Sequence, residues 1–343
     1  MKYTSMRPGE EWRDTEGKLI QAHGGSIMFW EGKYYWYGEN KEKTTDEKEI
    51  WHWGVKMYSS TDLYNWYDEG IVCEPVLDNP ENPLHPHTRM DRPHILYNKL
   101  TNKFVLWMKI MGNGHHQYMT VATADAITGP YKIVNERLHP YGILAGDFDL
   151  FEDDGKGYII FERAHEDMII ADLTADYLDV AAKYSVHFPR KCPPYVREAP
   201  AVFKKDGYYY MFTSGTTAKF PNPSEIARCD SMHGNWEVLG DPHIDDKKHT
   251  SFDSQISCVF RIEGTDKFIA MADRWLIDLP EEMPDIPTIY ECMFDETIES
   301  EYRDFPVYTL TKKNTSLARY VWLPVEFIDG VPMLRWYDEW TIE

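Results

Sequence analysis

The sequence predicts an all-β fold, and more narrowly a five-bladed β-propeller, from three observations. Five times a polar or small residue opens a short apolar strand, and a second strand follows after a turn that contains Gly or Asn. Spacings agree between units: eight residues from opening residue to turn glycine in two of them (24 to 32, 147 to 155), and thirteen from opening residue to phenylalanine in two others (91 to 104, 255 to 268). Apolar segments with helical periodicity are nearly absent. An internal repeat of this kind decides the fold class ahead of other signals.

The five opening residues are Gly24, Asp91, Asp147, Glu198 and Gln255. After its first two strands, each unit continues with a third strand, a loop and a fourth strand, as in VKMYSSTDLYNWYDEGIV. The loops contain Asp, Asn, Gly and Pro, which suit tight turns. Four short antiparallel strands about every fifty residues are typical of propeller blades. We expect blades near residues 20–75, 88–138, 145–188, 196–242 and 253–343, within a single catalytic domain that spans residues 1–343.

Two segments depart from the regular pattern. LPEEMPDIPTIYECMFDETIESEYRDF interrupts the last unit, and its Pro and acidic content predict a surface loop with a short helix. The first twenty residues are expected to pack against the last blade, because a propeller must cover its edge strands.

The composition excludes several classes of partner. The net charge is −21, and Lys and Arg form no stripe of the kind that follows a phosphate backbone, so nucleic acid and anionic membranes are poor partners. A neutral oligosaccharide or polysaccharide is compatible with this charge. The N-terminus lacks a signal-peptide pattern and no apolar run is long enough to span a bilayer, which predicts a cytoplasmic protein. The oligomeric state stays open.

Neither a metal nor a cofactor is expected. The five cysteines are widely spaced without a CxxC pair, so they are interpreted as reduced core residues. His85 and His87, like His115 and His116, are close pairs in Pro- or Gly-rich loops without a clear third ligand. No Gly-rich phosphate loop follows a strand, so no nucleotide cofactor is implied.

The repeat predicts a cluster of polar side chains. The innermost strand of every propeller blade starts at one end of the central channel, so the five opening residues should form a ring around a pocket there. This ring brings together the carboxyl groups of Asp91, Asp147 and Glu198 and the amide of Gln255. Hydrolysis of a glycosidic bond usually requires two carboxyl groups, one as acid and one as base or nucleophile. The alternative is that each carboxylate only accepts hydrogen bonds from nearby loop backbone.

The chain resembles glycoside hydrolase family 43. Segments VREAPAVFKKDGYYYMFTSG and GDFDLFEDDGKGYIIF are similar to strands of that family, whose five-bladed propellers remove arabinose, xylose or galactose with inversion. Five further segments resemble, more narrowly, the exo-β-1,3-galactanase subfamily of that family. They are WRDTEGKLIQAHGGSIMFWEGKYYWYGENKE, MDRPHILYNKLTNKFVLWMKI, SFDSQIS, MADRW and RYVWLPVEF. The resemblance covers nearly the whole chain.

The resemblance implies specific catalytic roles. The Glu of REAP, here Glu198, corresponds to the general acid, and an Asp in the third blade raises the pKa of that acid and orients it. Asp147 is preferred for this second role over Asp149 because its eight-residue spacing to the turn matches blade one. A like charge and burial both favour the protonated acid.

The catalytic base is left open by the resemblance. The wider family has an Asp before a Pro in blade one, whereas this chain has Gly24, which is also a feature of the subfamily. The remaining ring candidates are Gln255 and Asp91, and Asp91 stands where the subfamily usually has Glu. Gln255 would position the water while Asp91 or solvent receives the proton, or Asp91 would reach the water itself.

Substrate-binding residues follow from the same resemblance. Glu39, Tyr118, Asn222 and Trp275 stand where it implies contacts with sugar, with strand-edge or core packing as the alternative. The WHW segment, Trp51 to Trp53, lies in a loop of blade one and would form a stacking platform if its rings were exposed.

These observations predict an inverting exo-acting hydrolase that releases galactose from β-1,3-linked galactan or arabinogalactan-type oligosaccharides. One alternative is an α-L-arabinofuranosidase or β-xylosidase of the same family, against which the missing blade-one Asp argues. The other is a catalytically degenerate propeller that only binds glycans. Retention of both Glu198 and Asp147 argues against the second alternative.

Overall fold

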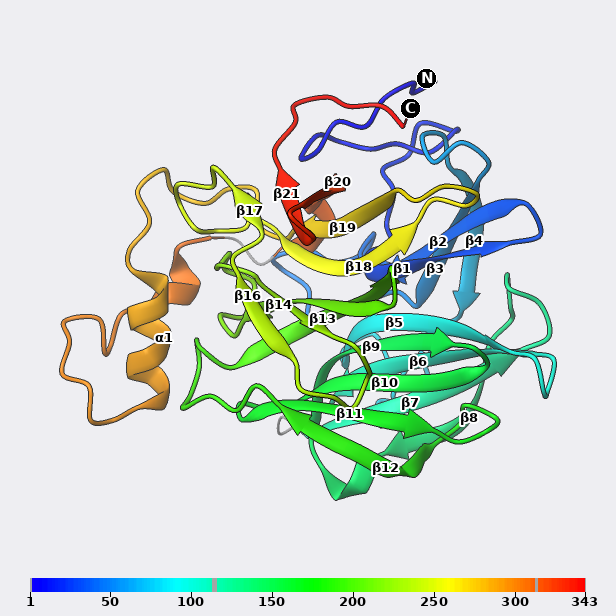
Figure 1. The fold of residues 1–343 in the computed structure, drawn as a ribbon, viewed down its shortest axis with the longest axis horizontal. Coiled ribbons are helices and arrows are strands. Elements are labelled where there is room, and N and C mark those ends of the chain that lie inside the picture. The colour runs from blue at the N-terminus through cyan, green and yellow to red at the C-terminus, as the bar shows by residue number, and fades with distance from the viewer. Residues whose placement is uncertain (1, 113–115, 312–313, 343) are drawn as a thin grey trace.

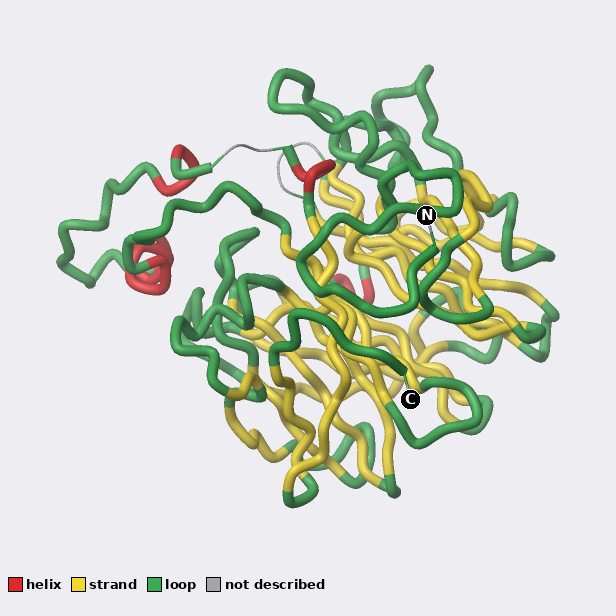
Figure 2. The backbone as a smooth tube through the Cα atoms, turned by 90° about the horizontal axis from the view of Figure 1, so that it is seen from above, coloured by secondary structure: helices red, strands yellow, loops and turns green. Residues whose placement is uncertain are grey.

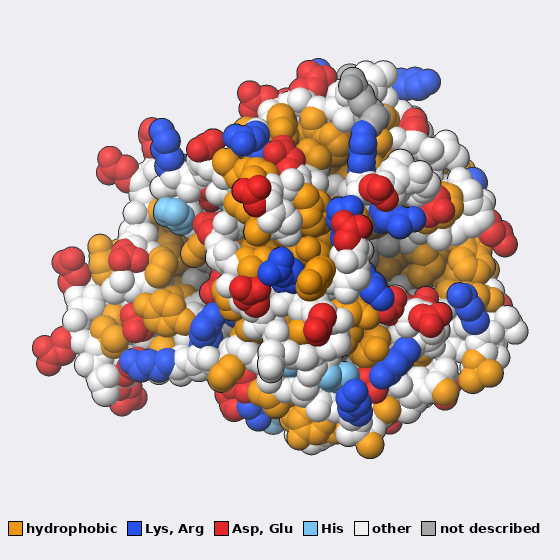
Figure 3. Space-filling view, viewed as in Figure 1, with side chains coloured by type: hydrophobic (Ala, Val, Ile, Leu, Met, Phe, Trp, Pro, Cys, Tyr) orange, Lys and Arg blue, Asp and Glu red, His pale blue; other side chains and the backbone are white. Residues whose placement is uncertain are grey.

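The protein is a five-bladed β-propeller, as predicted. The computed structural model describes residues 2–112, 116–311 and 314–342. In this part of the chain, five sheets follow one another along the sequence and are arranged around a common centre (Figures 1 and 2). Acidic and basic side chains are interspersed over the face shown in Figure 3, so the excess of negative charge is spread rather than gathered there.

The first four blades each contain four strands in chain order. Blade one consists of β1 (His23–Trp30), β2 (Lys33–Glu39), β3 (Val55–Ser60) and β4 (Tyr67–Cys73). Blade two consists of β5 (Arg89–Asn98), β6 (Lys103–Met111), β7 (Gln117–Ala124) and β8 (Lys132–Leu138). Blade three consists of β9 (Ala145–Asp153), β10 (Lys156–Arg163), β11 (Asp167–Leu173) and β12 (Val180–His187). Blade four consists of β13 (Arg197–Lys205), β14 (Tyr208–Gly215), β15 (Glu225–Cys229) and β16 (Glu237–Gly240).

The fifth blade contains an insertion. Its strands are β18 (Gln255–Arg261), β19 (Phe268–Arg274), β20 (Arg319–Ile328) and β21 (Val331–Arg335), with β17 (His243–Ile244) added parallel to β21. Between β19 and β20 the chain leaves the propeller and forms α1 (Ile286–Phe294), which stands apart from the sheets in Figure 1. Short 3-10 turns are η2 (Pro140–Gly142), η3 (Val307–Thr309) and η4 (Thr315–Leu317). The predicted surface segment with a short helix is therefore present.

The N-terminal segment covers the last blade, as expected. Met6 forms an isolated β-bridge with Trp340, and the N–H of Gly9 donates to the carbonyl of Tyr320 at 2.8 Å. The two termini consequently lie close together in Figure 1. Met6 is buried in a hydrophobic cluster that also contains the fully buried Trp36 and Trp322, so this closure contributes apolar burial as well as hydrogen bonds.

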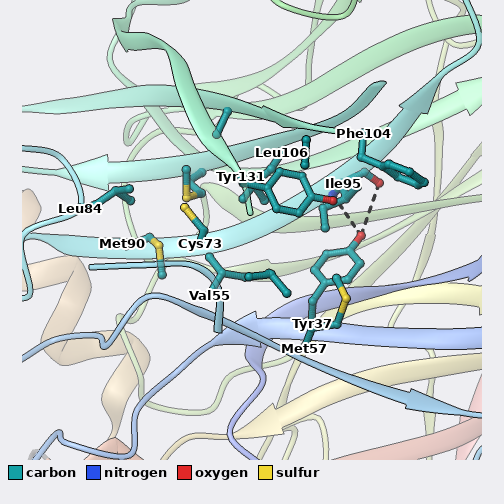
Figure 4. Close-up of a cluster of buried hydrophobic side chains, with 14 of the residues drawn as sticks. Tyr37, Val55, Met57, Cys73, Leu84, Met90, Ile95, Phe104, Leu106 and Tyr131 are labelled. Atoms are coloured by element: carbon teal, nitrogen blue, oxygen red, sulfur yellow. Dashed lines mark hydrogen bonds between the residues drawn. The ribbon is translucent and has the colours of Figure 1, made fainter. Parts of the chain in front are cut away.

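Apolar side chains between blades form the core. One cluster joins the first two blades, and in it the hydroxyl of Tyr37 accepts from the N–H of Ile95 at 3.0 Å (Figure 4). The five cysteines are buried and none forms a disulfide, in agreement with reduced core residues. No helix in the described part of the chain is long and apolar enough to cross a membrane.

The innermost strands position the site. β1, β5, β9, β13 and β18 lie side by side in this order around the centre, and β18 lies beside β1 again. Each of them contains an irregularity near its start, where one extra residue interrupts the pairing with the second strand. Such a bulge bends the strand and re-aims the side chains beside it.

These bulges correct the register predicted from spacing. In each strand one paired residue stands three positions before the regular pairing resumes, and these residues are His23, Asp91, Ala145, Glu198 and Gln255. Asp91, Glu198 and Gln255 therefore occupy this common position in their strands. Gly24 lies one residue further along its strand, after His23, and Asp147 lies two residues further, after Ala145. Equal spacing to the turn hid this offset, because β9 has one residue more than β1 between its bulge and its turn, which cancels the difference of one residue between Gly24 and Asp147.

Candidate active site

A small pocket lies where the innermost strands begin. Its volume is about 160 Å³, and polar side chains from all five blades line it. The lining consists of Glu39, Trp51, Arg89, Asp91, Arg92, Lys109, Met111, Asp147, Glu198, Ala218, Lys219, Gln255 and Trp275. The structure thus brings together the four side chains predicted to be catalytic, together with Glu39 and Trp275 of the four predicted to bind sugar.

Glu198 is suited to donate a proton. It stands at the bulge of β13, where Ala199 has a positive φ of 50°, and its Oε1 accepts from Nε2 of Gln255 at 3.1 Å. Burial raises the pKa of Glu198 well above its usual range, and the negative charges of Asp147 and Glu162 raise it further. Lys109 and Arg92 oppose this rise only in part. The carboxyl group is therefore held in its protonated form beyond the usual pH range of a glutamate.

Asp147 is held in its charged form. Its Oδ1 lies 2.9 Å from Nζ of Lys109 and its Oδ2 lies 3.2 Å from Nε of Arg92. Burial alone would raise its pKa, but the two cations outweigh burial and lower it. Glu198 and Asp147 are thus two carboxyl groups whose surroundings move their pKa values in opposite directions, which is the pattern of an acid and its modulating neighbour.

Asp149 lies elsewhere. Its Oδ2 accepts from the N–H of Val202 at 2.7 Å, and its Oδ1 lies 2.8 Å from Nδ1 of His94. It lines a separate cavity together with His94 and Cys258. Of the two candidate aspartates, Asp147 alone lines the pocket that contains Glu198.

Asp91 shares a cation with Asp147. Its Oδ2 lies 3.1 Å from Nζ of Lys109, and its Oδ1 accepts from Nε1 of Trp51 at 3.0 Å. Burial would raise the pKa of Asp91, but Lys109 and Lys41 outweigh burial and lower it below the usual range. Asp91 is consequently a strongly ionised and weakly basic carboxylate.

The amide of Gln255 is fully occupied. Its Nε2 donates to Glu198 Oε1 and, at 2.9 Å, to Oγ of Ser214. Its Oε1 accepts from Nη2 of Arg92 at 2.7 Å and from Nε1 of Trp275 at 3.1 Å. Four partners fix the amide in one orientation, so Gln255 holds the Glu198 carboxyl group in place.

Glu39 fills the space left by the glycine of blade one. Gly24 has a φ of 56°, and a Cβ atom built on it would lie 2.5 Å from Oε1 of Glu39. Oε2 of Glu39 lies 2.5 Å from Nζ of Lys41. Burial raises the pKa of Glu39 to about 7, against the attraction of Lys41 and with a further rise from Asp91. A carboxyl group is therefore present beside position 24 although residue 24 has no side chain.

Two predicted sugar-binding residues do not line the pocket. Tyr118 is buried in the hydrophobic cluster between the first two blades. The side chain of Asn222 bonds to the backbone N–H and carbonyl of Gly215 and to Oγ1 of Thr217. These bonds close the loop that presents Lys219, so Asn222 supports the wall of the pocket from behind.

The WHW segment contributes one residue. Trp51 lines the pocket, whereas His52 is fully buried and Trp53 packs beneath Lys43, whose Nζ lies 3.5 Å from its ring centroid. The predicted platform is thus reduced to a single ring.

Sequence reasoning missed the cations of the site. Arg92 and Lys109 pair with the ring carboxylates, and Lys219 lies on the loop after β14. Lys109 could have been found, because it is the cross-strand partner of Asp91 in the β5–β6 hairpin. Nothing in the local sequence pattern indicates Lys219.

The described residues contain no group of three or more His, Cys, Asp or Glu side chains that could hold a metal ion. His85 and His87 contact each other through their rings, with centroids 4.9 Å apart. His115 lies outside the described residues.

Comparisons with known proteins identify the family of the chain. The model of the glycosyl hydrolases family 43 matches residues 21–257. A structure described as a family 43 β-1,3-galactosidase superposes with a TM-score of 0.80 at 30% identity, covering 100% of this chain and 64% of the other. A second such galactosidase, in complex with galactodeoxynojirimycin, gives 0.78 at 30% identity, covering 98% and 100%. An exo-β-1,3-galactanase from Clostridium thermocellum gives 0.74 at 27% identity, covering 98% and 66%.

The chain thus spans about two thirds of the length of the first and third of these proteins and the whole of the second. The search of curated proteins gave no match. The family model covers more than half of the chain. The chain therefore belongs to glycosyl hydrolase family 43.

Proposed function

We propose that this protein is an inverting exo-acting glycoside hydrolase that releases galactose from β-1,3-linked galactan or arabinogalactan-type oligosaccharides. The galactose specificity is supported by the similar structures, which are described as β-1,3-galactosidases and exo-β-1,3-galactanases. The observation that supports the chemistry is the buried Glu198 carboxyl group. Its pKa is raised, and it lines the same pocket as the ionised Asp147.

In this proposal Glu198 protonates the leaving oxygen. A general acid needs its proton at the working pH, and the charge of Asp147 opposes the loss of that proton. Gln255 keeps the carboxyl group aimed into the pocket through its hydrogen bond. Inversion further requires a water on the opposite face of the sugar, with the acid and the base roughly 6.5–9.5 Å apart.

We assign the base to Glu39 rather than to Gln255 or Asp91. Both N–H groups and the oxygen of the Gln255 amide are already paired, and an amide is a weak proton acceptor. Asp91 is ionised but its lowered pKa makes it a poor base. Glu39 lies beside Gly24, lines the pocket and has a pKa near 7, where a general base is most effective.

The test is a comparison of leaving groups. Protonation matters least when the leaving group departs easily, so Glu198→Gln should lose about 10²–10⁴-fold in kcat on β-1,3-galactobiose and much less on an activated aryl galactoside. Glu237→Gln, an exposed glutamate on β16, is the matched control. Equal losses on both substrates would show that Glu198 binds rather than protonates.

The stereochemistry and the sugar are tested on the unmodified enzyme. Proton NMR of the first product should show α-galactose, the inverted anomer. Faster hydrolysis of aryl arabinofuranosides or xylosides than of galactosides would contradict the specificity. Binding of galactobiose without any turnover would instead support a propeller that only binds glycans.

A further inference from the structure

Three cationic side chains converge on one ring at the edge of the pocket. Nζ of Lys219 lies 4.3 Å, Nζ of Lys41 4.5 Å and Cζ of Arg89 5.2 Å from the ring centroid of Trp51. The face of an indole attracts a cation. The three charges nevertheless repel one another, so a shared ring alone is a weak reason for gathering them.

Two of these cations have no carboxylate of their own. Lys41 pairs with Glu39, and deeper in the pocket Lys109 and Arg92 pair with Asp147. Within the described part of the chain, no carboxylate oxygen is found within 4.0 Å of the charged groups of Lys219 or Arg89. Lys219 and Arg89 are therefore the two cationic side chains of the site without a carboxylate partner among the described residues.

The lining of the pocket is therefore positive in an acidic protein. Its four cationic side chains are Arg89, Arg92, Lys109 and Lys219. Against them stand Glu39, Asp91 and Asp147, because Glu198 is held protonated. In a chain whose net charge is −21, a local excess of positive charge is the electrostatic complement of an anionic ligand.

Lys219 is positioned rather than free. Its loop is closed by the three hydrogen bonds of Asn222, and its Nζ also lies 5.3 Å from the ring centroid of Trp275. Burial and the nearby charge of Lys41 lower the pKa of Lys219 to about 7, while Glu39 and Asp91 raise it and Arg89 lowers it further. An anion between Lys219 and Arg89 would relieve both the burial and the repulsion.

We infer that Lys219, Arg89 and Trp51 form a subsite at the edge of the pocket for an anionic substituent, a carboxylate or a sulfate, on the galactoside. This inference rests on the proposed function, since it names the class of galactoside that the same pocket takes. Carboxylate and sulfate share the chemistry that matters, which is oxygen acceptors with a negative charge that an ammonium and a guanidinium can bind together.

The experiment compares kcat/KM for neutral and charged disaccharides. The neutral probe is β-1,3-galactobiose, and the charged probes carry a sulfate at O6, or a carboxylate at C6, on either sugar. A hydrogen bond to a charged group contributes about 1.5–3 kcal/mol, which corresponds to roughly 10–100-fold. At least one charged probe should therefore have a kcat/KM about tenfold or more above galactobiose. Sulfate and carboxylate probes separate the two sources of charge.

Variants show whether the preference comes from this subsite. Lys219→Met and Arg89→Gln should each lower the charged-to-neutral ratio of kcat/KM by about tenfold. Lys99→Met removes the same charge at the turn after β5, about 25 Å along the strand from Asp91, and should leave the ratio unchanged. A loss that is equal on charged and neutral probes would overturn the subsite, and so would a ratio of one or less for every charged probe.

Binding provides a second readout that does not need turnover. Calorimetry with Glu198→Gln should show tighter binding of the preferred charged probe than of galactobiose, and adding Lys219→Met should remove the difference. If galactobiose is bound but not cleaved by the unmodified enzyme, the proposed function fails while this comparison still decides the subsite. If galactobiose is cleaved but no charged probe binds better, the subsite fails alone.

Discussion

Asp147→Asn should move the alkaline limb of the pH profile to lower pH. Glu198 acts as an acid only while protonated, so kcat/KM falls as pH rises through the pKa of Glu198 in the free enzyme. The negative charge of Asp147 is one of the causes that raise this pKa. Asparagine removes that charge and keeps the shape of the side chain. It also leaves Arg92 without its carboxylate partner, and Arg92 is one of the cations that lower the pKa of Glu198.

The charge of Arg92 is the same in both proteins, so the shift in the pKa of Glu198 comes from the lost charge of Asp147. A neighbouring charge shifts a pKa by about 1–3 units, so the limb should fall by at least about one unit in Asp147→Asn. Removing one partner of a buried ion pair also costs roughly 3–5 kcal/mol of folding stability. Lys109 keeps Asp91 at 3.1 Å, which places the expected stability loss near the lower end of that range.

The assay is kcat/KM against pH on β-1,3-galactobiose. Asp149→Asn is the matched control, because Asp149 is also buried on the same strand and accepts hydrogen bonds from two backbone N–H groups, but lies outside the pocket. It should lose stability without moving the limb. An unmoved limb in Asp147→Asn, or an equal shift in Asp149→Asn, would refute the assignment of Asp147 as the modulating carboxylate.

Two further predictions concern the same ring. Glu198→Gln should gain thermal stability relative to the unmodified protein as pH rises from about 4.5 to 7.5. Folding raises the pKa of Glu198, so its protonated form stabilises the protein below the unfolded pKa of 4.5, and this contribution is lost toward neutral pH. Glutamine does not titrate, so the variant does not undergo this loss. Thermal unfolding of both proteins at the two pH values checks this, and a constant difference in Tm would contradict it. If Glu39 is the base, Glu39→Gln should lower kcat by about 10²–10⁴-fold, and azide should restore turnover of a β-galactoside as α-galactosyl azide. If azide restores turnover of Asp91→Asn instead, the base is Asp91. If Gln255→Ala alone loses turnover while it still binds galactose, the role belongs to Gln255.

The architecture could be predicted from sequence because its signals are local. Turn glycines such as Gly32 and Gly155, which adopt positive φ at the tips of the first hairpins, mark where each blade begins to fold back. Apolar strands between these turns belong to contiguous blades, so the strand order within each of the first four sheets follows the chain. The insertion after β19 was likewise visible, because its prolines and acidic residues do not fit a strand.

The charges of the site could not be predicted in the same way. Lys219 reaches the pocket from a loop whose path depends on hydrogen bonds made by Asn222, and side-chain bonds within an irregular loop leave no periodic trace in the sequence. The bulges were equally hidden, since one extra residue in an innermost strand changes which side chain faces the channel without disturbing the apolar pattern beyond it. For the same reason Gly24 and Asp147 seemed equivalent although the pairing places them one residue apart.

Blade one has a carboxyl group in the pocket although its first strand supplies none. Sequence shows that Gly24 has no functional group, and this absence favoured a base from another blade. The hairpin pairing shows why a carboxyl group is still present: Glu39 is the partner of His23 across the β1–β2 ladder, directly beside the bulge that contains Gly24. With φ at 56° and the Glu39 oxygen 2.5 Å from any Cβ, position 24 excludes a side chain so long as Glu39 stays. Glycine at 24 and glutamate at 39 therefore depend on each other, because Glu39 occupies the space that a side chain at position 24 would need. The carboxyl group of blade one thus comes from the second strand rather than the first.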